Sequence, residues 1–281
     1  MGKVHSVEKR TDIQCLLRSD REYSGIFGLV VLPSGNVMIT DFHNRKIKTV
    51  HIDSGDVVGA LTMTSEPSDV TFIGYSKAAV TLPNERKLQL LTVTDDDRYI
   101  ALDHRINVDG RCVGIDWDHD TFLVSYDDPS QVQLISSGGI VLKTIRTDQR
   151  GSFIFRRPQG VAFARDKIHF YICDSETDEV MKVRRHDGIV MAINKEIYHP
   201  IGVVELPDEN VLVAGKDTNA IHLLSPYLKG LNTVLSTVDG ISRPRALCIR
   251  QRGNSRRWYD LIIGNRNGSV LTPYRFLFQP Y

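Results

Sequence analysis

The sequence has no long hydrophobic run and no cysteine cluster, and each absence excludes a class of protein. No stretch approaches the roughly 18 consecutive apolar residues that indicate a transmembrane helix. The four cysteines, Cys15, Cys112, Cys173 and Cys248, form no CxxC pair, so a structural zinc site built from cysteines is not expected. Residues 1–12 contain no apolar segment typical of a secretory signal. We therefore interpret the cysteines as reduced thiols and predict a cytoplasmic protein.

The chain also lacks a strong net charge, a helical period and any familiar catalytic motif. It carries 35 Lys and Arg against 34 Asp and Glu, and the net charge of +1 excludes a uniformly basic nucleic-acid-binding chain. No segment repeats apolar residues every 3.6 positions, so helices should be nearly absent. No nucleophile elbow, HExxH motif, P-loop or dinucleotide fingerprint is present. We expect no catalytic residues, no metal and no cofactor, and we predict that the chain is not an enzyme.

The charges that are present are unevenly distributed. Residues 51–150 carry 9 basic and 16 acidic side chains, a net of −7, and the remainder has a net of +8. The last 39 residues contain eight arginines and a single acid, Asp260. Basic and acidic faces are therefore expected on different parts of the surface.

A segment of 41 to 46 residues recurs six times along the chain. Each copy has a β run, a turn, a second β run that ends in polar residues, a third run and a short fourth one. It is clearest at residues 28–52, which read GLVVLPSGNVMITDFHNRKIKTVHI. Four β runs at a period in the forties are typical of a β-propeller blade. The equivalent positions in the six copies are Gly28, Asp69, Gly114, Gly160, Gly202 and Ala246.

The repeats predict an all-β fold, a six-bladed β-propeller with four-stranded blades in a single domain. The last copy has three convincing β runs, so the N-terminal run at residues 12–17 is expected to supply its outermost strand and close the ring. The blades are expected at about residues 24–63, 66–107, 110–146, 156–194, 198–236 and 241–281.

A polar motif of the form D-x-x-N-[RK]-x-I ends the second β run of several copies. Residues 41–47, DFHNRKI, match it closely, and residues 174–180 and 215–221 match it in part. Asp and Asn side chains accept hydrogen bonds from backbone N–H groups in turns, so Asp41, Asn44 and Asp174 are expected to brace these turns. The recurring glycines are expected to let neighbouring blades pack closely near the axis.

Together with the Pro-x-Gly sequence before the first β run, this motif resembles the NHL repeat. The chain as a whole is similar to the C-terminal propeller of tripartite-motif (TRIM) proteins with NHL repeats, although Asp69 replaces the glycine of blade 2 and blade 3 lacks the proline. The resemblance implies a non-catalytic module that recognises a protein or peptide partner. It also implies substrate recognition for a TRIM-type ubiquitin ligase whose RING domain is absent from this sequence.

One face of the predicted propeller combines basic and aromatic side chains. The loops that lead into the first strands and those that join the second and third strands share this face, and they are basic in blades 1 and 4–6. Such side chains also suit single-stranded RNA, so an RNA-binding domain is an alternative, and no DNA or membrane partner is expected. The candidate partner-binding residues are Tyr23, Phe42, His43, Arg45, Arg86, Arg156, Arg157, Tyr198, His199, Lys216, Arg243, Arg245 and Arg266.

A second alternative is a calcium-dependent, lactonase-like hydrolase. Such an enzyme needs several acids and asparagines in the central channel. Of the expected channel positions, Asp69 alone carries a carboxylate, and one carboxylate cannot hold calcium. The residue pattern therefore disfavours this alternative. The acidic run at residues 116–120 is interpreted as a hairpin turn.

Overall fold

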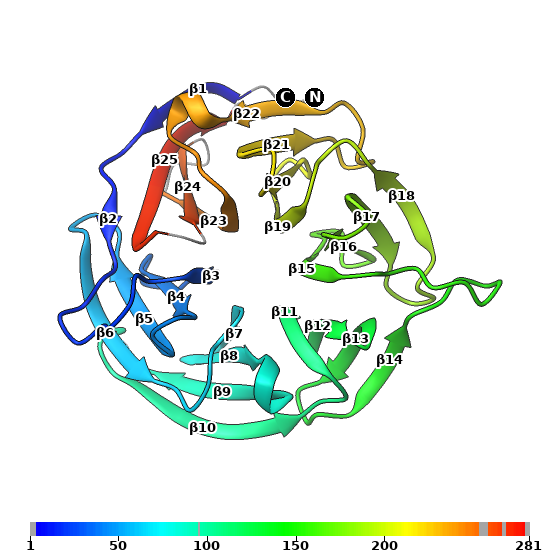
Figure 1. The fold of residues 1–281 in the computed structure, drawn as a ribbon, viewed down its shortest axis with the longest axis horizontal. Helices are drawn as coiled ribbons and strands as arrows, with labels where there is room; N and C mark the ends of the chain where they lie inside the picture. The colour runs from blue at the N-terminus through cyan, green and yellow to red at the C-terminus, as the bar shows by residue number, and fades with distance from the viewer. Residues whose placement is uncertain (1–3, 95, 253–257, 266–267, 279–281) are drawn as a thin grey trace.

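The computed structural model describes residues 4–94, 96–252, 258–265 and 268–278. Within these ranges, five antiparallel sheets of four strands and one of five, in which the short β2 (Ile13–Gln14) is additional, stand around a central axis, so the molecule is a six-bladed β-propeller (Figure 1). In the described residues, the helical segments are two 3₁₀ turns, η1 (Pro83–Glu85) and η2 (Thr237–Asp239). None of the described helices is long and apolar enough to span a bilayer. The all-β, six-bladed fold predicted from the repeats is confirmed.

Within each of the first five blades, the strands follow in chain order and the first strand lies nearest the axis (Figure 1). Blade 1 contains β3 (Ile26–Val31), β4 (Val37–Asp41), β5 (Lys46–His51) and β6 (Asp56–Thr62). Blade 2 contains β7 (Val70–Gly74), β8 (Lys77–Leu82), β9 (Lys87–Val93) and β10 (Ile100–Asn107). Blade 3 contains β11 (Arg111–Asp118), β12 (Thr121–Asp128), β13 (Ser130–Ser136) and β14 (Val141–Ile145). Blade 4 contains β15 (Pro158–Phe163), β16 (His169–Asp174), β17 (Glu179–Arg184) and β18 (Val190–Asn194). Blade 5 contains β19 (Pro200–Glu205), β20 (Val211–Gly215), β21 (Ala220–Leu224) and β22 (Asn232–Leu235).

Blade 6 combines the two ends of the chain. Its inner strands are β23 (Pro244–Gln251), β24 (Trp258–Asn265) and β25 (Val270–Phe278), and N-terminal β1 (Val4–Lys9) pairs with β25 as the outermost strand. Within residues 12–17, the run expected to close the ring, β2 (Ile13–Gln14) also pairs with β25. Strand β1 was not assigned from the sequence, because its residues VHSVEK contain two valines among polar side chains.

The hydrophobic core lies between successive blades. One cluster joins Ile26 and Ile39 of blade 1 to Ala246 and Ile262 of blade 6. The middle strands have a neighbouring blade on each face, and so β4 and β20 are buried at every position. Two-sided burial explains why these strands are continuously apolar in the sequence, whereas the outermost strands retain exposed positions.

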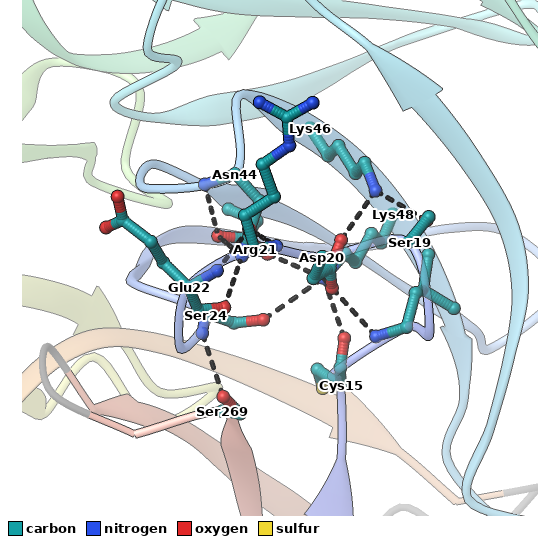
Figure 2. A network of polar contacts seen from close by, with 12 residues as sticks. Cys15, Ser19, Asp20, Arg21, Glu22, Ser24, Asn44, Lys46, Lys48 and Ser269 are labelled. Atoms are coloured by element: carbon teal, nitrogen blue, oxygen red, sulfur yellow. Dashed lines mark hydrogen bonds and ion pairs between the residues drawn. The ribbon is translucent and has the colours of Figure 1, made fainter.

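A segment from Cys15 to Ser24, between β2 and β3, is held against blade 1 by a buried polar network (Figure 2). The Nζ atom of Lys48, which has no exposed side-chain surface, lies 2.7 Å from Asp20 Oδ2 and 2.5 Å from Asp41 Oδ2. It also donates to the Cys15 carbonyl oxygen at 2.7 Å and to Ser24 Oγ at 3.1 Å. The network therefore anchors the loop that leads into the first strand of blade 1.

The recurring glycines allow the blades to approach each other at the axis, as predicted. A Cβ atom placed on Gly160 would overlap the carbonyl oxygen of Ile201 in blade 5, and one on Gly114 would overlap the carbonyl oxygen of Gln159 in blade 4. A backbone atom of the next blade cannot move aside as a flexible side chain can. These positions therefore require glycine for steric reasons.

Replacing Gly160 by alanine is expected to lower the free energy of unfolding by about 1–3 kcal/mol, because the added methyl group overpacks a rigid contact between blades. Urea denaturation of the variant and of the wild type measures this change. The matched control is Gly138→Ala, where the nearest atom to the added Cβ would be Ser136 Oγ at 3.9 Å. That change should stay within about 0.5 kcal/mol, and equal losses in the two variants would contradict the steric explanation.

Candidate functional site

A cavity with a volume of about 310 Å³ lies in the channel at the centre of the ring. It is lined by the innermost strands of all six blades, β3, β7, β11, β15, β19 and β23, which surround the axis in Figure 1. Small-molecule sites in proteins have volumes of roughly 300–1,000 Å³. The cavity therefore has room for a small ligand.

The side chains at the mouth of this cavity come from equivalent positions in the six blades. They are Phe27, Ser68, Val113, Gln159, Ile201 and Arg245. At the next position along the strands, blade 2 has Asp69, whereas the other five blades have glycine or alanine. Two residues further along, blade 3 contributes Asp116 to the cavity lining. The channel thus contains two carboxyl groups on neighbouring blades.

Asp69 is held by hydrogen bonds to two strands. Its Oδ1 atom accepts from the Val70 amide at 2.9 Å, and its Oδ2 atom accepts from the Ile115 amide of blade 3 at 3.0 Å. Burial raises the pKa of this carboxyl to about 7. The hydrogen bonds from the two amides lower the pKa, but their effect is smaller than that of burial. The charge of Asp116 raises the pKa further, and the cation of Arg245 lowers it. Asp69 therefore changes its protonation state near neutral pH.

Asp116 occupies a similar environment one blade further on. Its Oδ2 atom accepts from the Phe163 amide of blade 4 at 2.7 Å, and its Oδ1 atom accepts from the Trp117 amide at 2.8 Å. Burial raises the pKa of this carboxyl to about 6. The Thr71 hydroxyl of blade 2 also donates to Oδ1, at 3.5 Å. Because a carboxylate oxygen has two acceptor positions, Oδ2 can still bind a ligand.

Sequence reasoning missed Asp116. The acidic run at residues 116–120 was interpreted as a hairpin turn, but β11 extends through Asp118 and places Asp116 on the channel side. The position of Asp116 within the repeat could have indicated that its side chain faces the channel. Side chains two positions apart in a strand point to the same face, and Asp116 is two residues beyond the axial Gly114.

An aromatic stack leads from the loop face to the channel mouth. The Arg245 guanidinium lies 3.7 Å from the centre of the Phe27 ring, and Phe27 is stacked on Phe42 with centroids 4.3 Å apart. His43 contacts Phe42 edge-on at 5.5 Å, and Tyr23 lies against His43 at 4.8 Å. The structure thus brings together four of the predicted face residues, Tyr23, Phe42, His43 and Arg245.

A second group of predicted residues lies on blade 5. The Lys216 Nζ and His199 Nε2 atoms are 3.5 Å apart, and His199 Nδ1 lies 3.3 Å from Asp217. Burial is the main cause that lowers the pKa of His199. The positive charges of Lys216 and Arg157 lower this pKa further. This imidazole is therefore less readily protonated than a free histidine.

The remaining predicted residues are spread over the loops. Arg45 forms an ion pair with Glu66 at 2.7 Å. The exposed members of the predicted set are Tyr23, Arg45, Arg86, Arg156, Arg157, Tyr198 and Arg243. Arg266 lies outside the described residues. A partner-binding role for this face stays a prediction.

The turn-bracing role predicted for the polar motif is confirmed. Asp41 Oδ1 accepts from the amides of Gly25 at 3.3 Å and Asn44 at 3.2 Å. Asp174 Oδ1 accepts from the amides of Arg157 and Glu176. The motif is therefore explained by backbone geometry at the turn between the second and third strands.

No group of three or more His, Cys, Asp or Glu side chains in the described part of the chain is arranged to hold a metal ion. The donor set needed by a calcium-dependent lactonase is thus missing from these residues. All four cysteines are free and buried, and burial raises the pKa of the Cys15, Cys112 and Cys248 thiols to about 12.

Comparison with known proteins relates the fold to enzymes. No protein-family model matches the sequence, and a search of curated proteins finds no match. The structure is similar to a selenomethionine-substituted virginiamycin B lyase from Staphylococcus aureus, with a TM-score of 0.64 and 11% identity over 96% of this chain and 99% of that one. A catalytically inactive variant of the Staphylococcus aureus enzyme with quinupristin gives a TM-score of 0.62 at 12% identity, again covering 96% and 99%. A streptogramin B lyase gives 0.65 at 10% identity, covering 96% and 97%. At such identities the likeness shows the fold alone.

These comparisons correct the functional prediction made from the sequence. The three propellers named above, which match almost the whole chain, are lyases, and no NHL or TRIM family model matches it. The prediction of a non-catalytic TRIM-type recognition module, with its RNA-binding alternative, is therefore wrong, and so is the prediction that the chain is not an enzyme. The physical reason is that the NHL-like motif follows from turn geometry and does not specify a function.

Proposed function

We propose that this protein is an enzyme that binds a small molecule in the channel mouth and breaks one of its bonds by acid–base catalysis. The observation that carries the proposal is the placement of Asp69 and Asp116 in a single cavity. Five blades pack at the axis with glycine or alanine at the position of Asp69, so packing of the ring does not require a carboxyl group there.

The two carboxyl groups are suited to exchange protons with a substrate. The pair titrates with apparent pKa values of about 6 and about 7. Between these values the pair retains a single proton, so one group is ionised and can act as a base while the other is protonated and can act as an acid. Positioned groups of this kind accelerate reactions by about 10²–10⁴-fold.

The reaction class is suggested by the lyases of similar fold, because lyases break bonds by elimination. In our proposal, the Asp116 carboxylate removes a proton from the carbon next to a carbonyl group. The electron pair of that C–H bond forms a carbon–carbon double bond, and the leaving group on the adjacent carbon departs with its own bonding pair. Asp69 donates its proton to the leaving group. The Arg245 cation stabilises negative charge that develops on the carbonyl oxygen.

A panel of small carbonyl compounds with an acyloxy group on the β carbon tests this proposal. The wild-type protein is expected to convert at least one of them to an α,β-unsaturated product, which is followed by its ultraviolet absorbance. Mass spectrometry distinguishes the chemistry, since hydrolysis would add one water to the products and elimination would not. Conversion of none of the compounds, or products that contain added water, would overturn the proposal.

The dependence of kcat/KM on pH is expected to be bell-shaped. The rate should rise as pH passes through about 6, because the base must be ionised, and should fall as pH passes through about 7, because the acid must be protonated. Initial rates at constant ionic strength measure the two limbs. A rate that rises steadily across this range would contradict the assignment of an acid to the pair.

A further inference from the structure

The channel mouth also contains hydrogen-bond donors. Gln159 on β15 and Arg245 on β23 line the cavity from blades 4 and 6, whereas Asp69 and Asp116 lie on blades 2 and 3. Strands β11 and β23 face each other across the channel in Figure 1. A bound molecule therefore meets the Arg245 donors across the channel from Asp116, and the Gln159 amide on the blade that adjoins blade 3.

Gln159 presents a buried donor to this cavity. Its side chain is 8% exposed, and its Nε2 atom has no hydrogen-bond partner among the described residues. The Gln159 backbone is fixed, because Ser125 Oγ of blade 3 donates to its carbonyl oxygen. A buried polar group without a partner costs about 1–3 kcal/mol. An oxygen atom of a ligand in the cavity would remove that cost.

Arg245 supplies a positive charge at the channel mouth. Its guanidinium lies against the Phe27 ring, and Phe27 lies against Phe42, so the group is held in a fixed orientation at the mouth. Stacking uses the flat face of a guanidinium, while its five N–H donors lie in the plane. This planar fork matches the geometry of a carboxylate.

We propose that the molecule bound in this channel carries a carboxylate, and that Arg245 and Gln159 bind the carboxylate oxygens. The inference rests on the proposed function, since it names the substrate class of the same cavity: a small carboxylic acid with a leaving group on its β carbon. The apolar side chains of Phe27, Val113 and Ile201 line the mouth between the polar groups and contact the hydrocarbon part of the molecule.

The arrangement also orients the substrate. The like charges of Asp69 and Asp116 repel a carboxylate from blades 2 and 3, whereas the cation of Arg245 attracts it to blade 6. The carbon atoms next to the carboxylate then extend from Arg245 across the channel toward the acid–base pair. This orientation is the one that the proposed elimination requires.

Phenylacetate and its uncharged analogue phenylacetamide test the inference by direct binding. Neither has a leaving group, so binding is measured by calorimetry or by ligand-detected NMR without turnover. Phenylacetate is expected to bind the wild-type protein at least tenfold more tightly than phenylacetamide. Equal affinities for the two probes would overturn the inference, and this comparison needs no variant.

Variants assign the binding to particular side chains. Arg245→Met and Gln159→Glu should each weaken phenylacetate binding at least tenfold, while Arg245→Lys should weaken it less because the charge remains. The matched control is Arg243→Met, two residues away and exposed, which should not change the affinity. Unchanged binding in folded Arg245→Met, checked by its circular dichroism spectrum, would overturn the assignment.

The same measurements separate this inference from the proposed function. Asp69→Asn should bind phenylacetate at least as tightly as the wild type, because a repelling charge is removed, although its rate of elimination should fall sharply. Selective phenylacetate binding without turnover of any compound would overturn the proposed function alone. Turnover of uncharged esters with no preference for phenylacetate would overturn the carboxylate inference alone.

Discussion

Replacing Asp69 by asparagine is expected to lower kcat for the proposed elimination by about 10²–10⁴-fold with little change in KM. An amide has nearly the same shape as a carboxyl group, but it does not titrate and cannot deliver a proton to the leaving group. The change in kcat is measured from initial rates with the best compound of the carbonyl panel.

The control for this variant must lose a similar structural contact elsewhere. Glu205 accepts from the Arg165 amide at 2.6 Å and from the Tyr171 hydroxyl at 3.2 Å, and so joins blades 5 and 4 as Asp69 joins blades 2 and 3. Glu205 is not among the residues that line the cavity. Glu205→Gln should therefore retain full activity. Equal activity losses in the two variants would show that Asp69 acts through structure and not through its proton.

Replacing Lys48 by methionine is expected to lower the free energy of unfolding by about 3–5 kcal/mol, the cost of breaking a buried ion pair from one side. The buried Lys48 ammonium is shared by Asp20 of the segment before β3 and Asp41 of β4, and Figure 2 shows Lys48 beside Asp20. Methionine fills a similar volume but leaves Asp41 without a cation, while Asp20 is still paired with Lys46. Chemical denaturation followed by tryptophan fluorescence measures the loss.

Two further variants identify the cause of that loss. Lys9→Met removes a lysine from an exposed pair with Asp12, whose side chains are both 42% exposed, and should have no measurable effect. Adding Asp41→Asn to Lys48→Met should recover part of the stability, because Asp41 is the carboxylate that loses its cation, whereas Asp20 keeps its ion pair with Lys46. If the double variant is as unstable as Lys48→Met, the unpaired charge is not the cause.

The fold was predictable because each blade repeats the same physical constraints. Axial glycines such as Gly160 are set by backbone contacts, and the buried middle strands appear as continuous apolar runs. Strand β1 was not predictable in the same way. It lies at the rim, where Val7, Glu8 and Lys9 are exposed, and its mixed sequence has no distinct period.

The candidate site was predicted in part. Asp69 was placed at the axis by its position in the repeat, and Arg245 was assigned to the loop face. Asp116 was missed because its acidic neighbours resemble a turn. Neither pKa shift could be predicted from the sequence, because both depend on burial within a channel that six separate segments enclose. The functional prediction failed because a turn motif does not specify chemistry at the axis.

The pairing of β1 with β25 has a consequence for the order of folding. Blades 1 to 5 are each made from one continuous segment, but Val7 pairs with Phe276 across nearly the full length of the chain. Contacts between residues so distant in sequence carry the largest loop-closure entropy and form slowly. Blade 6 therefore exposes the open edge of β25 until the ring closes, and during that interval another chain can pair with this edge. Conditions that slow ring closure should then favour strand exchange between molecules over the closed monomer.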